Sequence, residues 1–338
     1  LYTCKLCIAA LQPCISDRGN CGERRQKSDS KILRQGSGAM TQSSTRPMAQ
    51  STTQSWQLWR DRRGHLSWLR VGTLVVLLMP LAKAVFQANE IAHGARPLNE
   101  LIHRAGFWAL VFLGVTLAVT PFRRILRTGN LIDVRRMLGV GTFCYIAAHL
   151  ALFFADQSYS LGKVIHEITH RVYLVVGAVA WLGLAVLAAT STDGMVRRLG
   201  GNRWRRLHQI IYVIALLALI HYFQQTKADV TVPTFAASLF LWLIGYRVLA
   251  WRQDTSDLST LSLIALAVAV SVLTFIGEAV GLAIAFHVSP LLVLGTMFDF
   301  DAGIRPGWQV LAAGLAVVVI DAAMGRWKRR PARTVAAE

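Results

Sequence analysis

Residues 204–223 read WRRLHQIIYVIALLALIHYF, a basic and aromatic start followed by an apolar run, with His208 and His221 near its two ends. A third histidine, His149, stands inside a second apolar run, residues 137–154. An imidazole ring in hydrocarbon must find a polar partner, so histidine is rarely placed there without a function. The stretch therefore predicts a membrane helix that carries part of a polar site.

The composition supports a chain with several membrane helices. Hydrophobic residues make up 54% of the 338 residues and charged residues only 16%. These values are too apolar for a soluble domain of this length. The formal net charge is +18, but the basic clusters fall between apolar runs. They indicate topology rather than a nucleic-acid surface.

Eight apolar runs are long enough to cross a membrane, which needs about 17–25 residues each. We expect an all-α bundle of eight helices, with six forming a core and two following at the C-terminal end. The predicted runs are 67–88, 105–120, 137–154, 172–190, 209–223, 232–251, 258–286 and 308–324.

Positive charge alternates between the loops. Clusters such as 123–136, 197–206 and 326–330 lie on one side together with Arg247 and Arg252, and the other side has few basic residues. Positive loops stay in the cytoplasm. We therefore expect eight crossings of the bacterial inner membrane with both termini in the cytoplasm.

The chain divides into three predicted parts. Residues 1–64 are polar, basic and without apolar periodicity, so we expect a disordered cytoplasmic leader. Because residue 1 is Leu, we place the natural start at Met40 or Met48. Residues 65–252 form the predicted six-helix domain, and residues 253–338 form a two-helix extension with a basic tail.

His149 and His221 are expected at similar depth near the periplasmic side, because the third and fifth helices run in the same direction. Haem iron takes axial ligands from opposite faces, and imidazole is a suitable donor. Two level histidines on two helices of a bundle therefore predict a haem site. The alternative is that each histidine only hydrogen-bonds a neighbouring helix.

His208 is expected at the cytoplasmic start of the fifth helix, about 20 Å from His221 along the axis. Their separation of 221 − 208 = 13 residues leaves them about 140° apart on an ideal helix. Either the helix is distorted, or His208 faces a different edge of the cavity from His221. The alternative to both is that His208 is simply a histidine at the membrane interface. At the same depth lie Arg135 and Arg136, which cannot ligate iron but could pair with haem propionates.

Two further features carry possible chemistry. His166 and His170 flank Glu167 at i, i+4 spacing, as on a metal-binding helix. No third ligand is near in sequence, so we favour solvated histidines in a periplasmic loop. Glu278 lies near the middle of the seventh run, a costly place for a carboxyl group. It indicates either a proton or ion path or a hydrogen-bonded structural acid.

The stretch from Gly106 to Tyr222 resembles the ferric reductase-like transmembrane domain, and most of all the haem-binding membrane subunit of the bacterial periplasmic methionine sulfoxide reductase system (the MsrQ or YedZ family). The resemblance rests on the order and spacing of many short pieces. These are TPFRR at 120–124, RRMLG at 135–139, AH at 148–149, AWL at 180–182, RRLG at 197–200, WRRLH at 204–208 and LIHY at 219–222.

This resemblance implies a b-type haem, one or two in number, held by His149, His208 and His221, and an FMN whose site the sequence does not mark. It implies a non-catalytic electron-transfer subunit that serves a periplasmic molybdopterin-containing reductase of oxidised methionine. The donor would be a cytoplasmic flavin reductase or the quinone pool. The extension after residue 252 and the histidine pair around Glu167 depart from the family pattern.

The sequence is also compatible with two other functions. A ferric reductase or oxidase of the same superfamily needs a flavin and nicotinamide domain, which the short tail after residue 324 does not provide, so it would rely on a separate reductase. A haem-free, proton-coupled transporter would use the intramembrane His and Glu side chains.

Overall fold

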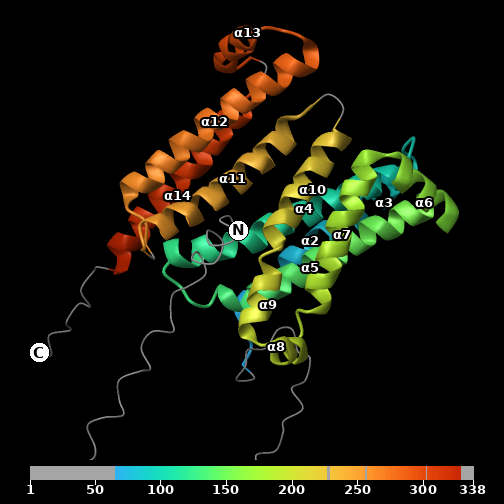
Figure 1. Ribbon diagram of the computed structural model, residues 1–338, viewed down its shortest axis with the longest axis horizontal. Coiled ribbons are helices and arrows are strands. Elements are labelled where there is room, and N and C mark those ends of the chain that lie inside the picture. Colours follow the sequence, from blue (N-terminus) through green and yellow to red (C-terminus); the bar gives the residue numbers. More distant parts are fainter. Residues whose placement is uncertain (1–64, 227–228, 256, 302, 329–338) are drawn as a thin grey trace, which may run out of the picture.

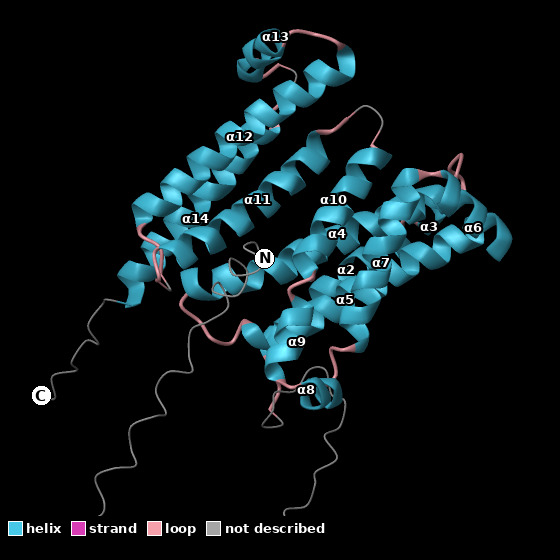
Figure 2. Cartoon of the chain, in the orientation of Figure 1, coloured by secondary structure: helices cyan, strands magenta, loops and turns pink. Residues whose placement is uncertain are grey.

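The computed structural model describes residues 65–226, 229–255, 257–301 and 303–328, and within them every regular element is a helix (Figures 1 and 2). Eight spans are long and apolar enough to cross a membrane. The predicted all-α bundle is therefore confirmed. The leader, with its start at Met40 or Met48, and the basic tail beyond residue 328 lie outside the described residues.

The spans match the predicted runs closely, and most extend further because polar residues at their ends remain helical. The second helix, predicted as short, gains two turns at its start and five residues at its end. The spans are α2 (Trp68–Phe86), α4 (Pro97–Ile125), α5 (Ile132–Asp156), α7 (Val172–Ala189), α9 with α10 (Gly201–His208 and Ile211–Gln225), α11 (Thr231–Arg252), α12 (Thr260–Phe286) and α14 (Pro306–Lys328).

Short helices connect the spans at both ends of the bundle. Figure 1 shows α3 (Ala88–Ala92), α6 (Leu161–His170) and α13 (Pro290–Gly295) at one end and α8 (Asp193–Leu199) at the other. A 3₁₀ turn, η1 (Thr296–Phe298), follows α13. The segment with His166 and His170, predicted as a loop, is helix α6, which begins where the Ser160 side chain caps the backbone N–H of Lys163. A serine before a helical pattern is a start signal that the loop assignment overlooked.

Helix α4 lies at the centre of the packing. Its buried Phe112 belongs to a cluster with Leu77 of α2 and Leu138 of α5. Its buried Leu117 belongs to a second cluster with Trp242 of α11 and Leu263 of α12. One helix thus joins both halves of the bundle, so the histidine-bearing helices are fixed against it.

The C-terminal pair, α12 and α14, packs closely on itself and on α11. Gly314 lies so near Ala267 that a Cβ at Gly314 would be 2.5 Å from the Ala267 Cβ. The Ser271 hydroxyl donates to the carbonyl of Gly307 at 2.9 Å. Small residues of this kind let membrane helices approach each other. The extension is therefore a packed helix pair that shares the Leu117 cluster with the six-helix part.

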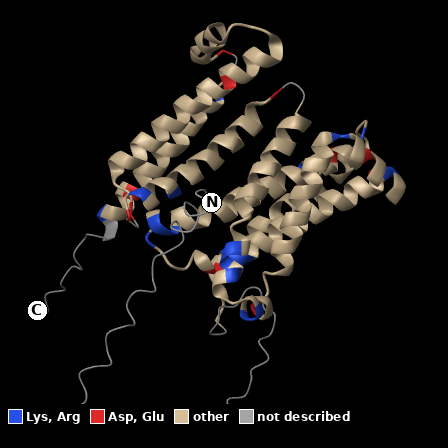
Figure 3. Cartoon of the chain, in the orientation of Figure 1, with Lys and Arg blue, Asp and Glu red and all other residues tan. Residues whose placement is uncertain are grey.

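Lys and Arg residues gather near the helix ends (Figure 3). Arg247 is an exception: it was grouped with the loop charges, but it is buried within α11 and only 7% exposed. Its guanidinium donates to the carbonyl oxygens of Leu243 at 2.6 Å and of Leu117 at 2.5 Å, and it lies 5.5 Å from the centroid of the Tyr212 ring. Arg247 therefore ties α11 to α4 rather than marking the membrane surface.

Candidate functional site

The structure brings together two of the three predicted histidines. His149 of α5 and His221 of α10 are partly buried, and their ring centroids lie 6.4 Å apart with the ring planes at 87°. The predicted proximity of these residues is therefore observed, although they come from helices separated by more than fifty residues of sequence. Whether the two rings can act as ligands depends on which ring nitrogen of each carries the proton.

Both histidines are held in the same way. The Nδ1 atom of His149 lies 2.8 Å from the carbonyl oxygen of Ile102 in α4, and the Nδ1 atom of His221 lies 2.7 Å from that of Tyr173 in α7. A carbonyl oxygen only accepts, so each Nδ1 carries the proton. In the neutral ring, Nε2 then carries no proton, and an imidazole nitrogen without a proton can bind a metal.

Two glycines make room for these rings. A Cβ at Gly106 would lie 3.0 Å from the His149 Nδ1 atom, and a Cβ at Gly177 would lie 2.9 Å from the His221 Nδ1 atom. Each glycine follows the carbonyl that binds the ring by four residues, since 106 − 102 and 177 − 173 both equal 4. Neither glycine was predicted from the sequence as part of the site. In the sequence, each glycine is marked by its position one helical turn after Ile102 or Tyr173, the residue that faces the histidine.

The spacing of the two rings fits haem iron. A metal–imidazole bond is about 2 Å long and the ligating nitrogen lies about 1 Å from the ring centroid, so two imidazoles on opposite sides of one iron have centroids about 6 Å apart. The observed 6.4 Å agrees with this value. The donor set, two neutral imidazoles fixed by backbone carbonyls, also suits an axial pair.

His208 lies away from this pair, at the other end of the same span. The span is broken between His208, the last residue of α9, and Ile211, the first of α10. The helix is thus distorted directly after His208, which is one of the two possibilities raised by the 140° offset. The His208 ring stacks on Trp204 at 4.0 Å, its Nδ1 lies 3.1 Å from the Trp204 carbonyl oxygen, and its Nε2 lies 3.4 Å from the Ser191 hydroxyl.

The two arginines expected near His208 differ in their surroundings. Arg136 is exposed and its Nη1 forms an ion pair with Asp193 of α8 at 2.7 Å. Arg135 is less exposed and follows the buried Val134 at the start of α5. Exposed ion pairs contribute little to stability, so the Arg136 pair can exchange for another anion at low cost.

The histidines of α6 do not form a metal cluster. The ring centroids of His166 and His170 lie 4.0 Å apart with the ring planes tilted by 33°, and both residues are exposed. Glu167 pairs instead with Arg171 at 2.7 Å. Within the described part of the chain, no group of three or more His, Cys, Asp or Glu side chains could hold a metal ion. This agrees with the preference for solvated histidines.

Comparison with known proteins places this site in a family. Residues 105–219 match the model of the ferric reductase like transmembrane component. This region includes His149 and His208 and ends two residues before His221. No solved structure matches the chain.

Several curated proteins are similar over most of their length. The protein-methionine-sulfoxide reductase heme-binding subunit MsrQ of Xanthomonas euvesicatoria pv. vesicatoria is 43% identical over 180 residues, which is 52% of this chain and 82% of the relative. The protein of the same name from Ralstonia nicotianae is 37% identical over 188 residues, which is 54% of this chain and 87% of the relative. Identity at this level over most of the relatives' length shows that the chain belongs to the MsrQ family of ferric reductase-like membrane proteins.

Proposed function

We propose that this protein is a membrane electron-transfer subunit that binds b-type haem between His149 and His221. The observation that supports this most strongly is the pair of carbonyl-anchored imidazoles with ring centroids 6.4 Å apart. The name of the related proteins, heme-binding subunit MsrQ, points to the same cofactor. Bound haem would supply reversible one-electron chemistry at its iron.

The residues of this chain would hold and orient the cofactor. His149 and His221 offer their Nε2 atoms, while the carbonyls of Ile102 and Tyr173 fix each tautomer. We assign His208 to the opposite end of the bundle as a candidate ligand of a second haem, without a histidine partner. Arg135 and Arg136 are the candidate partners of haem propionates there.

The electron acceptor we propose is a periplasmic molybdopterin-containing subunit that reduces oxidised methionine in proteins. The relatives are named as subunits of a protein-methionine-sulfoxide reductase. The donor would be a cytoplasmic flavin reductase or the quinone pool, and an FMN, if bound, would belong to this route. The chain itself would be a non-catalytic carrier, which agrees with a site built from ligands and backbone carbonyls.

We place the protein in the bacterial inner membrane with both termini in the cytoplasm. The basic clusters at the ends of α4 and α9 support this orientation. His149 and His221 would then lie near the periplasmic side, close to the acceptor. Membership in the family favours the carrier over a haem-free transporter.

The test is the absorption spectrum of the purified full-length chain, oxidised and then reduced with dithionite. We expect b-type bands in the wild type, and their loss or shift in His149→Ala and His221→Ala. His166→Ala is the matched control, because His166 is an exposed histidine outside the bundle. A colourless wild type made with adequate haem supply would refute the proposal.

A further inference from the structure

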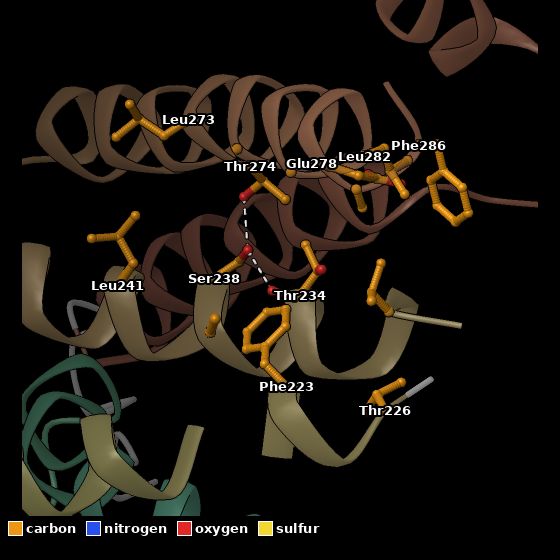
Figure 4. Close-up of a pocket in the computed structure, with 15 residues that line it drawn as sticks. Phe223, Thr226, Thr234, Ser238, Leu241, Leu273, Thr274, Glu278, Leu282 and Phe286 are labelled. Atoms are coloured by element: carbon orange, nitrogen blue, oxygen red, sulfur yellow. Dashed lines mark hydrogen bonds between the residues drawn. The ribbon is translucent and has the colours of Figure 1, made fainter. Parts of the chain in front are cut away.

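A cavity of about 520 Å³ lies between α10, α11 and α12 (Figure 4). This volume is within the range of small-molecule sites, about 300–1,000 Å³. Apolar side chains form much of its wall, among them Phe223, Leu241 and Leu282. The proposed haem ligands are not among its lining residues, so the cavity is not part of that site.

The cavity is built into the sequence of α12. Gly277 and Gly281 lie one helical turn apart and line it, and a Cβ at either position would meet nothing within 4 Å. Leu273 and Phe286 also line it and are 54% and 62% exposed. Since α12 spans the membrane by length and composition, this open side faces lipid. A lipid-soluble molecule could therefore enter laterally from the bilayer.

Glu278 places an unsatisfied carboxyl oxygen at this cavity. The residue is only 6% exposed, and its Oε1 lies 3.4 Å from Nη1 of Arg305. Its Oε2 is buried and has no hydrogen-bond partner, and the same holds for Nε of Arg305. A buried polar atom without a partner costs about 1–3 kcal/mol. A ligand that donates a hydrogen bond to Oε2 would remove this cost.

The neighbouring hydroxyl groups are already engaged. The Oγ1 of Thr274 lies 2.8 Å from the Ser238 hydroxyl, which donates to the carbonyl of Thr234 at 2.7 Å. Figure 4 shows this chain of contacts along the wall beside Glu278. Glu278 Oε2 is thus a buried polar atom of the cavity lining that has no hydrogen-bond partner.

We propose that this cavity binds a membrane-soluble molecule that carries a hydroxyl group, with the hydroxyl donating to Glu278 Oε2 and the apolar body lying between α11 and α12. A hydroquinone and a long-chain lipid alcohol both have this chemistry. A hydroquinone bound here would be one of the two electron donors named in the proposed function, and to that extent the inference rests on that function. Binding at this cavity does not require haem, so its failure can be distinguished from a failure of haem binding. Helix α12 lies after residues 105–219, which match the family model, and the proposed site assigns a function to this helix.

The test is the apparent Tm of the full chain in detergent, with decyl hydroquinone, the dimethyl ether of that compound, or dodecanol added. A ligand that binds the folded state stabilises it by RT ln(1 + [L]/Kd), so at equal concentration the tighter ligand raises the Tm more. We expect decyl hydroquinone to raise it and the ether, which has the same shape without donors, to bind at least tenfold more weakly. If dodecanol binds with an affinity similar to that of decyl hydroquinone, the ligand class is a lipid alcohol. If dodecanol binds at least tenfold more weakly, the ligand class is a hydroquinone.

Two variants locate the site. Gly281→Leu fills the cavity without a clash, and Glu278→Leu removes the acceptor; each should abolish the Tm shift caused by decyl hydroquinone. Gly72→Leu is the control, since Gly72 of α2 also has nothing within 4 Å but is far from the cavity in sequence and on another helix. Equal binding of hydroquinone and ether to the wild type, or an unchanged shift in Gly281→Leu, would overturn the proposal.

Discussion

His149 and His221 occupy equivalent positions on different helix pairs. Each Nδ1 contacts the carbonyl four residues before a glycine, Ile102 for His149 and Tyr173 for His221, and each ring lies against that glycine. The contact between α4 and α5 thus holds the His149 ring, and the contact between α7 and α10 holds the His221 ring. The two ring centroids lie 6.4 Å apart. This repeated arrangement fixes both rings, which is what a pair of axial ligands requires.

The first prediction concerns the glycines behind the rings. Gly177→Ala places a methyl group 2.9 Å from the His221 ring, so the ring must move from its carbonyl anchor. Loss of such support typically lowers metal affinity about 10–100-fold. We expect haem retention to fall by this order in Gly177→Ala and Gly106→Ala, measured by haem transfer to an apo-acceptor protein. Gly114→Ala on α4, where a methyl meets nothing within 4 Å, should retain haem as the wild type does.

A second prediction separates His208 from the other two histidines. His208 stacks on Trp204 and lies at the opposite end of the span from His221. His208→Ala should therefore keep the haem held by His149 and His221, and lose only haem bound at its own end. Haem content per protein, from pyridine haemochrome assays, checks this. A His208→Ala protein without haem would mean that the three histidines serve a single site.

The third prediction concerns the buried guanidinium of Arg247. Its two hydrogen bonds to backbone carbonyls join α11 to α4. Hydrogen bonds to charged groups contribute about 1.5–3 kcal/mol each, so the loss of both in Arg247→Ala should destabilise the fold by about 3–6 kcal/mol. We expect a fall in apparent Tm of several degrees. Arg252→Ala, at the exposed end of the same helix, should change it little.

A fourth prediction tests whether the C-terminal helix pair is a separate part. Gly314→Leu would drive a side chain into Ala267, whose Cα lies 3.2 Å from a Cβ at Gly314 and cannot move without the backbone. Since α12 and α14 meet at this point, the variant should separate them and increase proteolysis within residues 257–328. The haem spectrum should survive if residues 65–252 fold alone. Simultaneous loss of haem would show that the two parts fold together.

The sequence by itself determined the elements of this protein. Apolar runs of membrane length give the backbone no other way to satisfy its hydrogen bonds in lipid, so the eight spans were predicted to within a few residues at most ends. The histidines were also found from the sequence, because polar side chains in hydrocarbon are conspicuous. Two predictions from local sequence were wrong. The segment with His166 and His170 was predicted as a loop but is the capped helix α6. Arg247 was assigned to a surface cluster because it lies near a helix end, but it is buried.

Only the tertiary structure decided which groups meet. No periodicity could show that Ile102 and Tyr173 supply the carbonyls, or that Gly106 and Gly177 leave room for the rings, because these contacts join helices far apart in sequence. The break after His208 and the pairing of Glu278 with Arg305 depend in the same way on neighbours. Hydrophobicity sets which segments enter the membrane, whereas close packing between helices selects the few polar contacts that form a site.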